Sequence, residues 1–125
     1  MIRVTLKRAV LQAVIRDEAT RFALGDERLS EAGLAAMERR ITETLRKQLQ
    51  EMWPAQGIEV DLDEEPGGAP GDWVIRCVRS DDARLLPRIE DIVIANCRGE
   101  LMADLWADGD FEMIEGPAQR EALDA

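Results

Sequence analysis

Carboxylates are the only abundant side chains in this sequence that could do chemistry. They occur in close groups along the second half of the chain: Asp61 with Asp63, Glu64 with Glu65, Asp81 with Asp82, Glu90 with Asp91, and Asp104 with Asp108 and Asp110. Two or three carboxylates that converge in a pocket can serve as general acid and base, or can hold a hard cation. Asp61 and Asp63 lie opposite the apolar residues of an alternating segment, so we expect them on a solvated surface.

The other residue types on which catalysis depends are scarce. The chain has no His and no Tyr, and its Ser residues are Ser30 and Ser80. A cysteine nucleophile needs a neighbouring base, so Cys77 and Cys97 are predicted to be small buried apolar residues. Structural zinc needs more soft ligands than two cysteines, and residues 104–115 lack the ligand spacing of a calcium loop. We therefore expect no enzymatic activity, no metal and no cofactor.

The glycine-rich run at residues 66–71 is not a phosphate-binding loop. It joins two strand-like segments, contains no Lys, and is flanked by Glu64, Glu65 and Asp72, which would repel a phosphate. It is predicted to be the loop of a β-hairpin.

Negative charge is concentrated in the second half of the chain. Residues 1–56 contain ten Lys and Arg against eight Asp and Glu, whereas residues 57–125 contain six against eighteen. A field of one sign accelerates association with an oppositely charged surface and repels polyanions. We therefore predict a protein partner with a basic surface and no direct contact with nucleic acid; the interleaved charges of residues 1–56 are predicted to form a salt-bridged helical face.

Aromatic and apolar residues punctuate the acidic segment near the end of the chain. Trp residues are enriched at binding hot spots, so an acidic segment that carries one could anchor a basic partner. The predicted partner-binding residues are Glu59, Asp61, Asp63, Glu64, Asp104, Trp106, Asp108, Asp110, Phe111 and Glu112. Trp53 and Trp73 are instead predicted to complete the core.

Two helices are predicted in the first half. Apolar residues recur at helical spacing over 6–24, although alternation in the first six residues leaves a short strand as the alternative. Ser30 and Glu31 predict the start of a second helix, which ends at Trp53 and Pro54. The short connection between the two favours an antiparallel helical hairpin.

Two strands and one helix are predicted in the second half. Residues 58–63 alternate with period two, and residues 73–79 resume the alternation after the loop, which predicts a β-hairpin. Within it, Arg76 could meet an acidic residue across the ladder. Residues 80–82 predict a helix start, and apolar residues at every fourth position continue the helix to Trp106. Pro87 is expected in the first turn of this helix, or between a short turn over residues 83–86 and a main helix that starts at Arg88. A strand over 91–97 is the alternative.

The predicted class is α+β in the order helix, helix, strand, strand, helix. The length of 125 residues suits one domain over 1–116, followed by a mobile tail over 117–125. No apolar run is long enough to cross a membrane and no signal peptide is recognisable, so we expect a cytoplasmic protein.

Two functions are favoured by these features, and a carboxylate-based metal enzyme is a third hypothesis, which calorimetric titration with magnesium, manganese or calcium would test. The first is a non-catalytic acidic interaction protein, an inhibitor or regulator that docks its second half on a basic groove. The groove could belong to a nucleic-acid-processing complex, in the manner of the small acidic nucleic-acid mimics of phages and mobile elements. That comparison rests on charge and size alone. The alternative is a homodimer or larger assembly that packs through the amphipathic helices, with Val10 and Val14 on one flank and Leu11, Ile15 and Phe22 on the other.

Overall fold

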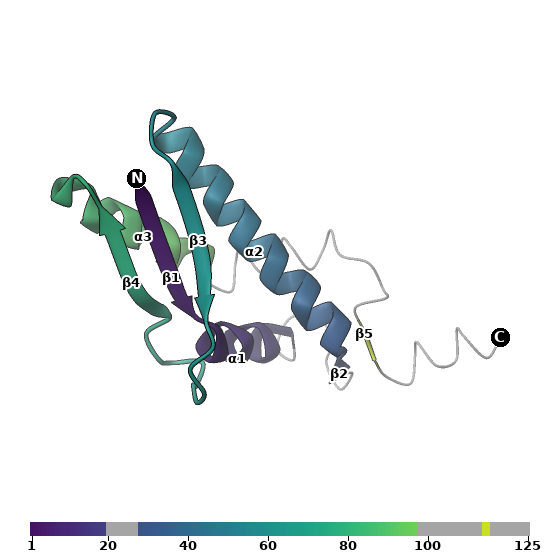
Figure 1. Cartoon of the computed structure of the whole chain (residues 1–125). Helices are drawn as coiled ribbons and strands as arrows, with labels where there is room; N and C mark the ends of the chain where they lie inside the picture. Colours follow the sequence, from purple (N-terminus) through teal and green to yellow (C-terminus); the bar gives the residue numbers. More distant parts are fainter. Residues whose placement is uncertain (20–27, 98–113, 116–125) are drawn as a thin grey trace.

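The structure is a computed structural model that describes residues 1–19, 28–97 and 114–115. Its elements follow the chain as β1 (Ile2–Lys7), α1 (Arg8–Glu18), β2 (Arg28–Leu29), α2 (Glu31–Met52), β3 (Ile58–Asp63), β4 (Ile75–Ser80), the short 3-10 helix η2 (Ala83–Leu85), α3 (Leu86–Asn96) and β5 (Ile114–Glu115) (Figure 1). The α+β class is confirmed. The predicted order is wrong, because a strand precedes the first helix and the main sheet has three strands.

The first strand replaces the start of the predicted helix over 6–24. Ile2, Val4 and Leu6 are fully buried, and the residues between them are partly or fully exposed. Alternation of this kind suits a strand with one covered face, whereas a helix would bring only one or two of these residues to the core. The chain then turns directly into α1 at Arg8, without a side-chain cap.

The main sheet has the strand order β3-β1-β4. β1 pairs in parallel with β3, from Ile2 opposite Ile58 to Lys7 opposite Asp63, and antiparallel with β4. The predicted hairpin is therefore wrong, because β1 lies between the two strands that it would have joined. Residues 64–74 connect β3 to β4 past the end of β1 (Figure 1).

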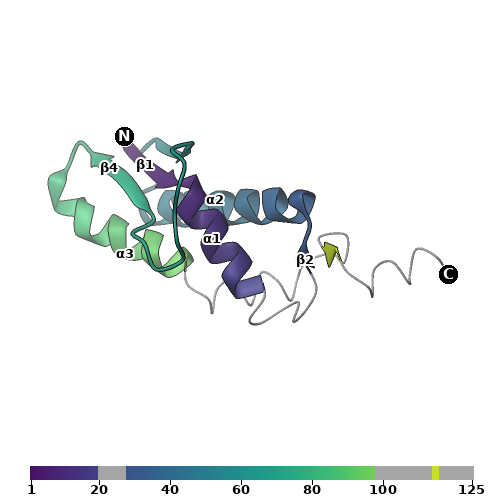
Figure 2. The same ribbon diagram turned by 90° about the horizontal axis from the view of Figure 1, so that it is seen from below.

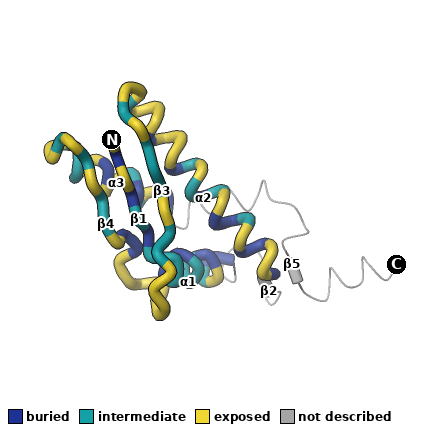
Figure 3. Tube along the Cα trace, viewed as in Figure 1, coloured by how far each residue is buried: buried dark blue, intermediate teal, exposed yellow. Residues whose placement is uncertain are grey.

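Helices α2 and α3 cover one face of this sheet, and α1 leaves its end (Figures 1 and 2). The buried residues of β1, α1, α2 and α3 form one apolar core, which appears as the dark blue segments in Figure 3. The core members from the helices are Val10, Leu11, Ile15, Leu34, Met37, Ile41, Leu45, Leu49, Ile89 and Val93. Burial of each large side chain contributes about 1.5 to 3 kcal/mol, so this core holds the sheet and the helices together.

The second predicted helix is confirmed as α2. The Ser30 hydroxyl accepts a hydrogen bond from the Gly33 N–H at 2.9 Å, which satisfies one of the free donors at the helix start. At the other end, the Trp53 N–H donates to the Leu49 carbonyl before Pro54 stops the helix, and Trp53 packs against the core as predicted.

Residues 86–96 form the helix α3, so the alternative strand over 91–97 is wrong. Pro87 lies in the first turn, where its missing N–H has no intrahelical acceptor to lose. Ile89 and Val93, four residues apart, face the core. The predicted continuation to Trp106 and the predicted tail over 117–125 lie outside the described residues.

The apolar helix positions that suggested self-association are used within one chain. Val10, Leu11 and Ile15 are buried and Val14 packs against the core, while Phe22 lies outside the described residues. In the part of the chain that the structure describes, no helix is long and apolar enough to span a bilayer. β2 and β5 form a separate two-residue antiparallel ladder, with Leu29 opposite Ile114.

Candidate functional site

The acidic strand β3 lies beside basic residues on the uncovered face of the sheet. Because Val4 and Leu6 point into the core, their neighbours Arg3, Thr5 and Lys7 point to the other face. The parallel register places Glu59 opposite Arg3, Asp61 opposite Thr5 and Asp63 opposite Lys7. The three acidic residues therefore share one row, as the alternation predicted, and the row next to it carries two cations.

Two of these acidic residues are engaged by arginines. Arg3 contacts the Glu59 carboxylate through Nη2 at 2.6 Å, and the hydrogen bond with Glu59 raises the pKa of Arg3. Arg76 contacts Asp63 at 3.3 Å. Asp61 is exposed and has no ion pair with any described residue, so it is the row's one carboxylate open to a partner.

Arg76 reaches β3 because of a bulge in β4. Thr5 is opposite Cys77, but Leu6 is opposite Ile75, so Arg76 is an extra residue in the ladder. Ile75 and Val78 consequently share the covered face, whereas unbroken alternation had placed Ile75 with Cys77. The prediction that Arg76 meets an acidic residue is confirmed, although the contact passes across β1.

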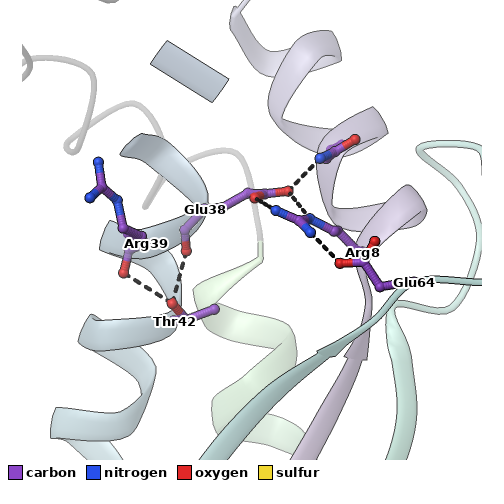
Figure 4. Close-up of polar contacts among 6 residues, drawn as sticks. Arg8, Glu38, Arg39, Thr42 and Glu64 are labelled. Carbon is purple, nitrogen blue, oxygen red and sulfur yellow. Dashed lines mark hydrogen bonds and ion pairs between the residues drawn. The ribbon is translucent and has the colours of Figure 1, made fainter. Parts of the chain in front are cut away.

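Glu64 belongs to a polar cluster at the junction of β1 and α1 (Figure 4). Arg8 donates from Nε and Nη2 to the two oxygens of Glu38, at 3.1 and 3.0 Å, and from Nη1 to Glu64. Gln12 donates to the same Glu38 carboxylate at 2.6 Å. The hydrogen bonds with Glu38 and Glu64 raise the pKa of Arg8. The Glu38 side chain is only 4% exposed, so the cluster fastens α2 to the β1-α1 junction and to the chain after β3.

Residues 64–73, which we call the acidic loop, are all exposed. The loop carries the carboxylates Glu64, Glu65 and Asp72 and ends at Trp73. Its exposed carboxylates lie close to Asp61 in sequence and extend the acidic row beyond the end of the sheet.

Several contacts hold the acidic loop in one conformation. Arg8 binds Glu64 at its start, Arg76 binds Glu65 at 3.3 Å, and the Asp72 carboxylate accepts from the Ala69 N–H at 2.9 Å. The backbone also passes close to α1, because a Cβ atom at Gly68 would lie 2.8 Å from the Val10 nitrogen.

Gly67 lies at φ 88°, a conformation in which a residue with a Cβ is strained. The loop is thus exposed, and its backbone is restricted at Gly68 and at Ala69.

Trp73 is 56% exposed, so its predicted place in the core is wrong. The core is closed beneath it by Val74 and Ile75, which are buried. Beside Trp73 lies an apolar hollow of about 190 Å³, lined further by Val14, Pro70, Asp72, Val74, Ile94 and Cys97. An exposed indole next to an apolar hollow is the composition of a protein-binding hot spot.

The remaining predicted binding residues lie outside the described residues. They are Asp104, Trp106, Asp108, Asp110, Phe111 and Glu112. Of the predicted set, the structure brings Glu59, Asp61, Asp63 and Glu64 together along β3 and the start of the acidic loop.

The described residues offer little for metal or thiol chemistry. Within the ranges 1–19, 28–97 and 114–115, no three His, Cys, Asp or Glu side chains come together to hold a metal. Cys77 and Cys97 are free thiols, and burial raises the pKa of Cys97 to about 12, which keeps it protonated near neutral pH.

The sequence did not predict the roles of three residues: Arg8 and Glu38 in the polar cluster, and Trp73 at the end of the acidic loop. Glu38 had a recognisable signal, because it lies four residues after Leu34 and three before Ile41, on the flank of the apolar stripe of α2. A carboxylate at such a position needs a cation from another element.

No protein-family model, curated protein or solved structure matches this chain. Its function must therefore be inferred from its own residues.

Proposed function

We propose that this chain is a non-catalytic binding protein, an inhibitor or regulator that docks the acidic loop and Asp61 onto a basic surface of a protein partner. One observation carries the proposal: the acidic loop is exposed along all of residues 64–73 and ends at Trp73, which is 56% exposed beside an apolar hollow. The acidic and aromatic residues at 104–112 belong to the same proposal as further contacts.

The fixed conformation of the loop supports a role in binding. A loop that must be ordered when its partner arrives loses conformational entropy, and this loss weakens the complex. Here the close approach of Gly68 to α1 and the Asp72 bond to the Ala69 N–H restrict the loop beforehand, and the solvated contacts of the two arginines add little to this restriction. The free energy gained by burying Trp73 against the partner is then not offset by the cost of ordering the loop, and it contributes to the affinity.

Charge supports a basic partner. Asp72 lies at the hollow beside Trp73, Asp61 has no ion pair among the described residues, and the whole chain has a net charge of -10. A partner surface that suits this pattern has an apolar or aromatic pocket for Trp73 with Lys and Arg around its rim. Such charges chiefly accelerate association and select the partner, while the buried aromatic contributes most of the affinity.

The test is an affinity capture of proteins from a lysate of the source cell on the immobilised chain. The wild type, Trp73→Ala and Met52→Ala are compared at low and high salt. Met52 is the matched control, because it is 46% exposed at the far end of α2 and away from the acidic loop. We expect a captured protein that is lost with Trp73→Ala, retained with Met52→Ala, and released as the salt concentration rises.

Two outcomes would refute the proposal. A partner held equally by the wild type and by Trp73→Ala does not use the loop, and a partner whose affinity is independent of salt is not selected by the carboxylates. Circular dichroism of each variant shows that a loss of binding is not a loss of fold.

A further inference from the structure

A second surface lies at the other end of the sheet from the acidic loop. There, a hollow of about 680 Å³ is lined by side chains from the start of β1, the end of β4 and the start of α3. Its polar wall consists of Arg3, Arg79, Ser80 and Asp81, whose carboxylate is paired with the Met1 amino group, and its apolar wall consists of Val78 and Leu86.

Two like charges stand directly opposite each other at this hollow. The antiparallel register of β1 and β4 pairs Arg3 with Arg79, an arrangement that destabilises a sheet unless an anion intervenes. Arg3 is already bound to Glu59 on its other side. Arg79 is exposed and has no ion pair within the described residues, since the nearby Asp81 contacts the Met1 amino group at 2.9 Å.

Beside the hollow, β4 has an unpaired edge. Within the described part of the chain β4 pairs only with β1, and it forms the left margin of the sheet in Figure 1. The other margin, β3, is flanked by α2. Every second residue of an edge strand turns its N–H and C=O outward, so β4 offers a ladder to an additional strand.

The alternation of β4 determines what such a strand must carry. Residues directly opposite each other in a sheet point to the same face, so a residue next to Arg79 lies on the uncovered face and a residue next to Val78 lies on the covered face, toward Leu86. A carboxylate suits the first position and an apolar side chain suits the second.

We propose that the free edge of β4 binds an extended peptide segment of a protein partner, in which acidic and apolar residues alternate, as a fourth strand of the sheet. A carboxylate of this segment lies beside Arg79 on the uncovered face and pairs with it, as Glu59 pairs with Arg3, and the next side chain packs over Val78 and Leu86. This site is separate from the acidic loop. Its partner segment is acidic, whereas the partner surface proposed for the acidic loop is basic.

The competing explanation is that Arg76 and Arg79 only protect the edge from other strands, as charged residues on edge strands commonly do. The two explanations differ in what they predict for an acidic strand. If the two arginines only protect the edge, β4 should bind no added strand of either charge. The proposed site should bind acidic strands.

The experiment titrates the full chain with the capped peptide Val-Glu-Val-Glu-Val and, as its counterpart, Val-Lys-Val-Lys-Val, by calorimetry and by amide NMR shifts. We expect saturable binding of the acidic peptide only, with shifts concentrated in Ile75–Ser80. Arg79→Gln should weaken binding about tenfold, the loss of one charged contact of about 1.4 kcal/mol. Arg88→Gln, an exposed arginine of α3 outside the hollow, should leave it unchanged.

Other results would overturn the proposal. These are equal binding of the two peptides, no binding of either, or full binding to Arg79→Gln. Binding of sodium glutamate as tight as that of the peptide, without shifts in β4, would show an anion site with no added strand. Trp73→Ala should bind the peptide as the wild type does, so failure here and failure of the proposed function are distinguishable.

Discussion

Arg3 and Arg8 lie at the two ends of β1 and make the same kind of contact with very different consequences. Each reaches a glutamate through Nε and Nη2. The Glu59 side chain of the first pair is 41% exposed, whereas the Glu38 side chain of the second is 4% exposed. Water competes for Glu59 and screens its charge, whereas within the described part of the chain Arg8 and Gln12 are the donors that replace the water lost by the Glu38 carboxylate. The Arg3–Glu59 pair therefore positions side chains on the surface, whereas the Arg8–Glu38 pair stabilises the fold.

The same contrast separates the two faces of the sheet. The covered face carries the apolar residues that stabilise the fold. The uncovered face carries charged residues whose replacement should change the stability little. The acidic loop combines both characters, because its backbone is packed against α1 while its side chains are exposed.

The largest expected effect comes from removing the cation of the buried pair. Arg8→Ala leaves the Glu38 carboxylate buried, with Gln12 as its remaining donor among the residues that the structure describes, and should lower the free energy of unfolding by about 2 to 4 kcal/mol. Urea denaturation measures this loss. The double variant Arg8→Met with Glu38→Leu should recover most of it, because no buried charge is then left unpaired. A loss below about 0.5 kcal/mol for Arg8→Ala would contradict the role assigned to the cluster.

The next effect tests whether the acidic loop is fixed by its backbone. Gly68→Ala places a Cβ 2.8 Å from the Val10 nitrogen, so the loop or α1 must shift, at a cost of about 1 to 3 kcal/mol. Gly71→Ala is the matched control, since nothing lies within 4 Å of its Cβ, and it should change stability by no more than about 0.5 kcal/mol. Equal denaturation midpoints for the two variants would show that the loop does not rest on α1.

The exposed pair should matter much less than the buried one. Arg3→Ala removes a contact between two solvated side chains, so we expect a denaturation midpoint close to that of the wild type. Any difference at low salt should disappear in 1 M NaCl, where the Debye length is about 3 Å. A midpoint shift as large as that of Arg8→Ala would abolish the distinction between the two ends of β1.

The smallest effect concerns the two thiols. Because burial raises the pKa of Cys97 to about 12, a thiol reagent at pH 8 should modify Cys77 first and Cys97 slowly. Cys77→Ser should therefore remove the fast phase.

A raised pKa also means that the folded state favours the protonated thiol. The stability that this contributes is complete below the ordinary thiol pKa and is lost as the pH rises above it, and Cys97→Ala should lack this loss. Rapid modification of both cysteines in the folded wild type would show that Cys97 is open to solvent.

Features with a local cause were predictable from the sequence. Ser30 followed by a stripe of Leu and Met at helical spacing defines α2, because both the cap and the stripe lie within one segment. The helix over residues 86–96 was predictable for the same reason, although its Ile and Val residues also suit a strand.

Features with a distant cause were not predictable. Residues 58–63 and 75–80 read as a hairpin because a tight connection is the most economical local arrangement. The intervention of β1, whose residue Ile2 pairs with Ile58, leaves no sign in either segment. The bulge at Arg76 likewise depends on how Leu6 is packed.

The candidate site shows the same division. The shared face of Glu59, Asp61 and Asp63 followed from alternation, but their neutralising arginines come from other strands. The apolar side chain of Trp73 suggested a place in the core. Trp73 is exposed because Val74 and Ile75 fill the core in its place.

The central position of β1 also bears on how the chain acquires its shape. β1 precedes both of its neighbours in the chain, Ile58–Asp63 and Ile75–Ser80, by more than 50 residues. Until residues 58–63 and 75–80 have been synthesised, β1 lacks the two neighbours that it has in the described sheet. Pairings that span such separations form late and slowly. During that interval Ile2, Val4 and Leu6 are exposed to water and to other chains.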